Sequence, residues 1–277
     1  MQALLVTLVV GGVTLAAGDK GDKGGGAVKI PDKNLEAALR AVLRDAKGDL
    51  TEAQLAANVF ILEAKGKKIA DLTGLEKCKN LQLLNLADNE VADLTPLKDL
   101  KDLQWLDVSR NKVSDLTPLK NLTRLSYVEL SHNQIASPEG LGELKNLMAL
   151  YLSDNKVSDL GPLAGLARLS SLSLAKNQIK DLSPLAGVTK LSTLNLRDNQ
   201  IEDLGPLAKQ TELSLLMLDN NKISDLTPLV KAVQADAAGP KRFAPYLRLF
   251  VEGNPLSAQA KGEQLKALTE AGVRLQK

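Results

Sequence analysis

Cysteine, histidine and aromatic residues are all scarce in this chain of 277 residues. One cysteine excludes an internal disulfide, and one histidine excludes a histidine-based metal cluster. The sequence has no glycine-rich phosphate loop and no basic block with interleaved aromatic residues. The net charge of +2 gives no drive toward nucleic acid or an anionic membrane. The composition therefore favours neither an enzyme nor a nucleic-acid-binding protein, and it implies no cofactor.

What the chain does contain is a 22-residue repeat, L-x-x-L-x-L-x-x-N-x-[IV]. Positions 4 and 6 of the repeat alternate around position 5, which predicts a strand with one buried face. No single unit can bury its leucines alone, so the units must stack into a parallel sheet with strands about 4.8 Å apart. The units begin at Val59, Leu81, Leu103, Leu125, Leu147, Leu169, Leu191 and Leu213, with a degenerate ninth at Tyr246.

The pattern is the leucine-rich repeat signature, and it sets the predicted fold class. We expect an α/β solenoid, a leucine-rich repeat right-handed superhelix. Its parallel sheet is concave, its convex turns are short 3-10 or helical segments, and helical caps cover both ends because terminal units would otherwise expose core.

Two polar columns accompany the leucines. A short amide at position 9 suits a tight turn, where it can satisfy buried backbone groups. Aspartate recurs at position 13 in D-L-x-P-L segments, which are typical of a helical turn that the aspartate caps or braces, with threonine or serine before the proline as the cap residue. A cation site or acid–base chemistry is the alternative for this second column. The columns are Asn89, Asn111, Asn133, Asn155, Asn177, Asn199 and Asn221, and Asp71, Asp93, Asp115, Asp159, Asp181, Asp203 and Asp225, interrupted by Ser137.

The single cysteine and histidine both have structural interpretations. Cys78 occupies position 20, which is leucine or valine in the next five units, so we expect it to fill a core slot as a small hydrophobic residue. His132 occupies position 8, on the solvent side of its strand, and its sequence neighbours imply no serine or carboxylate partner.

The N-terminus predicts export. Residues 1–18 resemble a signal peptide, since Ala3 to Ala17 is apolar and too short to span a bilayer, and small residues follow for cleavage. No basic residue precedes this run. Residues 19–28 form a Gly/Asp/Lys linker. We therefore expect a secreted or cell-envelope protein, without membrane insertion of the mature chain, that is a monomer.

The remaining chain divides into three parts. Residues 29–58 predict a helical N-terminal cap, with a helix from Asn34 to Arg44 and a second that Thr51 and Gln54 start as a capping box. Residues 59–256 hold about nine repeats, with an 11-residue insertion within 230–245 that predicts a longer convex helix. Residues 257–277 predict a helical C-terminal cap that stops near Gly272.

The chain resembles the internalin-type leucine-rich repeat proteins of bacteria. The resemblance rests on the 22-residue units, the D-L-x-P-L segment and the front-cap motifs Ile30-Pro31-Asp32 and Gly48-Asp49-Leu50-Thr51, and it covers about 29–256. It implies a non-enzymatic, exported protein that binds a protein partner on its concave sheet. Ser137–Leu141 departs from the motif, and neither an immunoglobulin-like module nor an L-P-x-T-G anchor follows the repeats. Host invasion is therefore not implied.

The aromatic residues indicate where a partner would bind. Positions 2, 3, 5, 7 and 8 face the concave side, and five of the few aromatic residues fall there: Phe60, Trp105, Tyr127, Tyr151 and Phe250. Of these, Phe60 and Phe250 lie at the ends of the repeats. Trp, Tyr and Arg most often dominate interface energies. The predicted binding residues are an apolar lane of Leu83, Trp105, Tyr127, Met148 and Tyr151 with a polar rim of Asp107, Arg110, Glu129 and His132.

Three alternatives stay open at this point. Aromatic residues favour strands in general, so the lane could be a consequence of propensity alone. A cytosolic regulatory scaffold that resembles the phosphatase-regulating leucine-rich repeat proteins would use the same unit. A structural envelope protein without a specific ligand would leave the lane unexplained. The units that begin at Leu169 and Leu191 carry serine and threonine instead, so recognition is predicted in the first half of the repeats.

Overall fold

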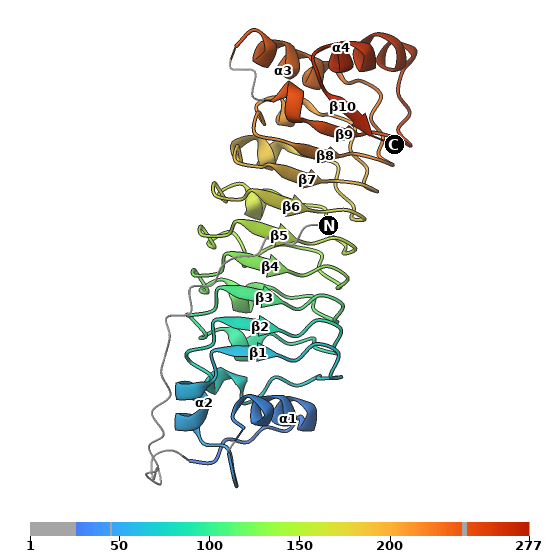
Figure 1. Ribbon diagram of the computed structural model, residues 1–277. Helices are drawn as coiled ribbons and strands as arrows, with labels where there is room; N and C mark the ends of the chain where they lie inside the picture. The colour runs from blue at the N-terminus through green and yellow to red at the C-terminus, as the bar shows by residue number, and fades with distance from the viewer. Residues whose placement is uncertain (1–25, 45, 240–242, 277) are drawn as a thin grey trace.

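The computed structural model describes residues 26–44, 46–239 and 243–276. Ten short strands form one parallel sheet in strict chain order, from β1 to β10, and the molecule is an elongated stack (Figure 1). The leucine-rich repeat solenoid predicted from the 22-residue period is therefore confirmed. The strands are β1 (Ile61–Glu63), β2 (Leu83–Asn85), β3 (Trp105–Asp107), β4 (Tyr127–Glu129), β5 (Ala149–Tyr151), β6 (Ser171–Ser173), β7 (Thr193–Asn195), β8 (Leu215–Met217), β9 (Arg248–Phe250) and β10 (Arg274–Gln276).

The register of the sheet follows the repeat without a slip from β1 to β8. Leu84 pairs with Leu106, and Leu106 with Val128, so equivalent positions lie side by side. Position 4 is fully buried in these strands, while positions 3 and 5 on either side of it are only half-buried in β2 to β8. The leucines of all units form one continuous core, which includes Cys78. Burial raises the pKa of the Cys78 thiol to about 12, as expected for an inert core residue.

Short 3-10 turns return the chain on the convex side. They are η1 (Leu75–Lys77), η2 (Thr95–Leu97), η3 (Thr117–Leu119), η4 (Gly161–Leu163), η5 (Ser183–Gly187), η6 (Gly205–Leu207) and η7 (Ala244–Tyr246). The aspartates of position 13 brace these turns: the Asp93 carboxylate accepts from the Thr95 backbone N at 2.8 Å. Thr95 is itself the first residue of the turn and not its cap. The prediction of threonine as cap was thus wrong, because the preceding aspartate already holds that backbone N–H.

The position-9 asparagines join neighbouring units. Asn177 Oδ1 accepts from Val157 N at 2.9 Å, and its Nδ2 donates to Leu152 O of the preceding unit and to Leu174 O of its own. The same contacts recur along the column, and Asn254 extends it into the ninth unit through Ile223 N. The amides therefore satisfy buried backbone groups of two units at once, as predicted.

Position 8 adopts left-handed backbone geometry throughout the column. Its φ values lie between 54° and 59° in Asp88, Arg110, His132, Asp154, Lys176, Asp198 and Asn220. Aspartate and asparagine tolerate this geometry better than other non-glycine residues. The sharp turn at position 8 places its side chains at the carboxyl ends of the strands.

Helices cover both ends of the stack. At the front, α1 (Lys33–Val42) packs against β1 and α2 (Glu52–Asn58) against η1, and Thr51 forms the predicted capping box with Gln54. At the back are α3 (Thr227–Ala237), the π-helix η8 (Ala260–Gln264) and α4 (Leu265–Glu270). The chain then forms β10, which pairs with β9 and was not predicted. The leader and most of the linker predicted within 1–28 lie outside the described residues.

Candidate binding surface

Strands β3, β4 and β5 present the predicted aromatic lane on one face of the sheet. Trp105 and Tyr127 occupy position 3 and are direct neighbours in the register. Their rings stack with centroids 4.9 Å apart and planes 7° from parallel. Tyr127 and Tyr151 follow at 5.5 Å with a tilt of 46°. The three rings form a continuous row across three strands, and each is half-buried.

The row continues in apolar side chains on both sides. Leu83 pairs with Trp105 in the register, and the exposed Ile61, which the sequence reasoning did not select, pairs with Leu83. Met148, just before β5, is 40% exposed. A surface hollow of about 360 Å³ is lined by Gln104, Arg124, Ser126, Asn146, Met148 and Arg168. The structure thus brings the predicted apolar residues together on one face. We call Leu83, Trp105, Tyr127, Met148 and Tyr151 the aromatic lane.

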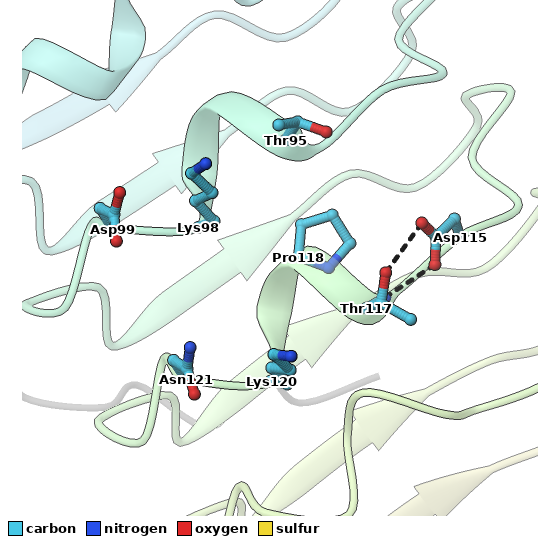
Figure 2. Close-up of a pocket in the computed structure, with 8 residues that line it drawn as sticks. All are labelled: Thr95, Lys98, Asp99, Asp115, Thr117, Pro118, Lys120 and Asn121. Atoms are coloured by element: carbon cyan, nitrogen blue, oxygen red, sulfur yellow. Dashed lines mark hydrogen bonds between the residues drawn. The ribbon is translucent and has the colours of Figure 1, made fainter.

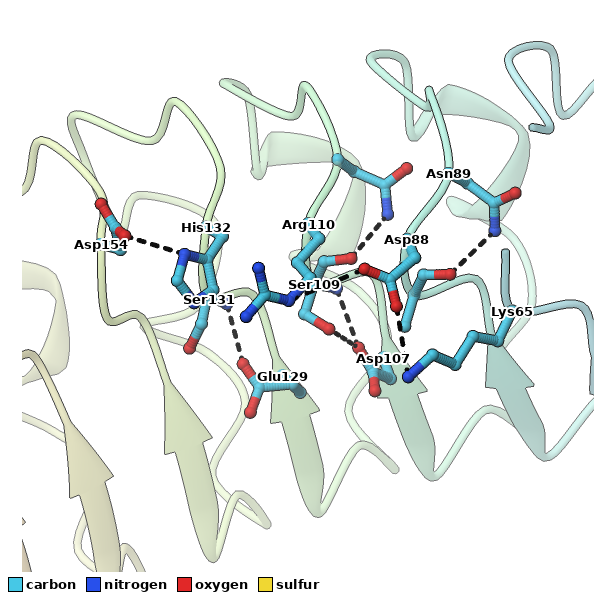
Figure 3. Close-up of polar contacts among 12 residues, drawn as sticks. Lys65, Asp88, Asn89, Asp107, Ser109, Arg110, Glu129, Ser131, His132 and Asp154 are labelled. Carbon is cyan, nitrogen blue, oxygen red and sulfur yellow. Dashed lines mark hydrogen bonds and ion pairs between the residues drawn. The ribbon is translucent and has the colours of Figure 1, made fainter. Parts of the chain in front are cut away.

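A column of carboxylates runs beside the aromatic lane at position 5. Glu129 lies two residues after Tyr127 on the same strand face and opposite Tyr151 in the register. Glu129 Oε1 accepts from Ser131 N at 2.8 Å, and Asp107 Oδ1 accepts from Ser109 N and Oγ at 2.8 and 2.6 Å (Figure 3). Glu63, two strands away from Asp107, accepts from Asn85 Nδ2. Glu63 was not among the predicted binding residues, although it occupies position 5, one of the positions predicted to face the concave side.

Burial sets the electrostatics of this column. Removal from solvent raises the pKa of Glu129, and the neighbouring Asp107 raises it further, against hydrogen bonds from Ser131 and the positive field of Arg110. Burial, and secondarily the charge of Glu129, raises the pKa of both Tyr127 and Tyr151. The phenols therefore stay neutral near pH 7 and offer a hydroxyl and an aromatic face.

The other two residues of the predicted polar rim, Arg110 and His132, lie at position 8. Asp88 forms ion pairs with Lys65 at 3.2 Å and with Arg110 at 3.7 Å (Figure 3). His132 Nδ1 lies 2.8 Å from Asp154 Oδ2. The sequence interpretation of His132 as a residue without a carboxylate partner was therefore wrong, because stacking places position 8 of the next unit beside it.

The half of the sheet face formed by β6 to β9 carries different side chains. Ser171, Ser173 and Thr193 occupy the positions held by aromatic residues in β3 to β5. Further on, Arg197 pairs with Asp219 and lies 4.6 Å from the centre of the Phe250 ring. The ring of Phe250 thus contacts a cation of its own chain, whereas Phe60, at the other end of the sheet, is 41% exposed.

A second hollow, of about 260 Å³, lies between η2 and η3 on the convex side (Figure 2). Most of the residues that line it occupy equivalent positions in two successive units. Within it, the Asp115 carboxylate accepts hydrogen bonds from the backbone N and the hydroxyl of Thr117. Among the described residues, no group of three or more His, Cys, Asp or Glu side chains is arranged to hold a metal ion. Within the same residues, no helix combines the length and apolar character needed to cross a membrane.

These features define a leucine-rich repeat solenoid, a class whose members are generally non-enzymatic protein-binding scaffolds. The family described as "Leucine Rich repeats (2 copies)" matches residues 145–187 and 189–231. A comparison with curated protein sequences gives no match.

Solved structures narrow the class. Internalin C2 of Listeria monocytogenes is 36% identical, covers 72% of this chain and 88% of its own, and has a TM-score of 0.69. Internalin F of the same species is 26% identical over 90% and 91%, with a TM-score of 0.55. A leucine-rich repeat protein of Leptospira interrogans, 23% identical over 75% and 57% with a TM-score of 0.64, shares the fold. The chain belongs to the internalin-like leucine-rich repeat proteins of bacteria.

Replacement of Glu129 by glutamine is expected to stabilise the fold at neutral pH. Because the pKa of Glu129 is raised on folding, its ionised form opposes folding at pH values above the folded pKa. That cost disappears as the pH falls below the unfolded carboxyl value of about 4.3. Glutamine keeps an acceptor for Ser131 N, so the variant should be more stable than the wild type at pH 7 and equally stable at pH 3.5. Urea unfolding at both pH values measures this.

Glu90→Gln is the matched control for that measurement. A hydrogen bond from Lys112 lowers the pKa of Glu90, so the ionised carboxylate favours folding there. Loss of its charge should lower stability slightly at pH 7, the opposite sign. Equal effects of the two substitutions at pH 7 would contradict the assignment of a desolvated charge to Glu129.

Proposed function

We propose that this chain is an exported, non-enzymatic scaffold that binds a protein partner on its concave sheet, through the aromatic lane and the rim of Asp107, Arg110, Glu129 and His132. The observation that carries the proposal is the stack of Trp105, Tyr127 and Tyr151 on three neighbouring strands. Tryptophan and tyrosine each contribute about 2 kcal/mol or more when they are binding hot spots. The half-buried rings remain open on the solvent side of the sheet.

The scaffold favours binding because it holds these side chains in place before a partner arrives. Each strand that carries a ring is hydrogen-bonded to a neighbour on both sides, and the rings support one another. Little side-chain freedom is then lost on association, which lowers the free-energy cost of binding. A standard interface needs about 800 Å² from each partner, and a face of ten strands offers room for it.

Capture experiments test this function. The wild type and a Trp105→Ser, Tyr127→Ser, Tyr151→Ser variant would be cross-linked to proteins of the cell envelope and the medium of the producing organism. We expect a partner that the wild type captures and the variant does not, since the loss of three ring contacts should weaken binding by at least about 100-fold.

The control is a Leu215→Ser, Met217→Ser variant. These residues occupy positions 3 and 5 of β8, the same repeat positions as Trp105 and Tyr151, on the far half of the same face. Circular dichroism would establish that both variants fold. Equal capture of the partner by the wild type and the triple variant would refute the aromatic lane as the binding surface.

A further inference from the structure

The face that carries the aromatic lane has a charge opposite to that of the whole chain. At the concave positions of the first five units there are five acidic residues and two basic ones, whereas the chain as a whole has a net charge of +2. The acidic residues are Glu63, Asp88, Asp107, Glu129 and Asp154, and the basic ones are Lys65 and Arg110. A local reversal of charge on an otherwise basic protein favours a partner surface that is positively charged.

The carboxylates of this face fall into two groups. At position 8, Asp88 is paired with Lys65 and Arg110, and Asp154 with His132. At position 5, within the part of the chain that the structure describes, Glu63, Asp107 and Glu129 form no ion pair and accept only from amide and hydroxyl donors. The position-8 carboxylates are thus paired within the chain, while the position-5 carboxylates keep their charges available for a partner.

Glu129 lies where charge and aromatic surface meet. It follows Tyr127 on the same face of β4, and Tyr151 is its direct partner on β5. A cation held at the Glu129 carboxylate would also contact the face or the hydroxyl of a tyrosine ring, a combination that suits an ammonium or guanidinium group. Burial makes the ionised Glu129 costly while it lacks a counter-charge, and a bound cation would offset that cost.

We propose that the aromatic lane binds a protein segment in which a lysine or arginine lies beside an apolar side chain. Glu129 holds the cation against the exposed side of the Tyr127 and Tyr151 rings, and Trp105 and Leu83 contact the apolar neighbour. The proposal rests on the proposed function of the concave sheet and names the chemistry of its partner.

Selection from a displayed library of random dodecapeptides tests this inference. The baits are the full chain, the Trp105→Ser, Tyr127→Ser, Tyr151→Ser variant, Glu129→Gln, and Glu90→Gln as a charge-matched control away from the sheet. We expect the wild type and Glu90→Gln to enrich peptides with lysine or arginine next to an apolar residue. Glu129→Gln should lose the enrichment of the cationic residue and keep that of the apolar one, and the triple variant should lose both.

One selected lysine peptide is then synthesised with lysine or with Nε-acetyl-lysine, which removes the charge and keeps most of the shape. Its dissociation constant for the wild type should rise at least about tenfold on acetylation, the size of one charge-assisted hydrogen bond. Its dissociation constant for Glu129→Gln should change little on acetylation.

The outcomes separate the two proposals. Enrichment of apolar peptides without lysine or arginine, lost in the triple variant, would overturn the cation inference and leave concave-face binding intact. Identical peptides selected by the wild type and the triple variant would overturn concave-face binding through the lane. No enrichment with the wild-type bait would overturn the inference that a linear cationic segment is recognised.

Discussion

Substitution of Gly140 by alanine is expected to cost about 3–5 kcal/mol of folding free energy, one of the two largest effects we predict. Gly140 has a φ of +92°, which an alanine adopts only with strain. A Cβ at this position would lie 2.3 Å from the carbonyl oxygen of Leu116 and 2.7 Å from its carbonyl carbon. Both atoms belong to the backbone of the preceding unit, so the clash cannot be relieved by rotation of a side chain. Urea unfolding followed by circular dichroism measures the loss.

The requirement for glycine here follows from the local departure from the repeat. In the unit that begins at Leu125, the buried Pro138 stands where other units have leucine, and Gly140 stands where most have proline. The segment packs against Leu116 and Thr117 of the preceding unit. Gly262→Ala is the control, since a Cβ there meets nothing within 4 Å and lies in a helix. It should be neutral or slightly stabilising. Equal stability of the Gly140→Ala variant and the wild type would show that the two units are less tightly packed than described.

Replacement of Asn177 by alanine should cost about 3 kcal/mol. The substitution leaves the buried Val157 N–H without its acceptor and removes donors to Leu152 O, Leu174 O and Ala175 O. A buried donor left unpaired costs about 1–3 kcal/mol. Each lost hydrogen bond adds about 1 kcal/mol when the carbonyl that accepted it has no other donor. Leu152 O and Leu174 O retain Asn155 and Asn199 as donors, which limits the total.

Asn121→Ala provides the comparison for this loss. Asn121 is exposed on the convex side, so its replacement should change stability by no more than about 0.5 kcal/mol. Both measurements use chemical unfolding of the full chain. A similar small effect at Asn177 would mean that water or a backbone shift replaces the amide and that the ladder is not a main source of cohesion between units.

The sequence was sufficient for the fold because the repeat encodes each contact many times. The leucines, the position-9 asparagines and the position-13 aspartates each recur at one spacing, so one stacked arrangement satisfies all of them. The two helices of the front cap and the longer helix α3 were also foreseen, because their apolar spacing, capping residues and an insertion of half a unit were visible.

The features that the sequence did not predict depend on contacts that do not recur from unit to unit. The strand β10 has no repeat motif and exists because β9 offers an unpaired edge. The pairing of His132 with Asp154 depends on the left-handed geometry of position 8, which no single residue type indicates, since aspartate, arginine, histidine and lysine all adopt it.

For the candidate surface, the register alone placed Trp105, Tyr127 and Tyr151 together, and the structure adds how their rings meet. The sequence could not distinguish carboxylates that are paired within the chain from those that are not. Asp88 and Asp107 look alike in the sequence, yet Asp88 has two cationic neighbours and Asp107 binds Ser109. Only the three-dimensional arrangement separates them, and the inference about a cationic partner depends on that difference.

The alternation of inward and outward residues in each strand has an evolutionary consequence. Leu106, Val128 and Leu150 point into the core, while the residues beside them lie half-buried on the outer face of the sheet. Natural selection must preserve the first set and is free to change the second. The outer residues of strands β6 and β7 are serine, threonine and asparagine. These strands then represent unused area on which a second specificity can evolve by a few point mutations, without a change in the buried leucines.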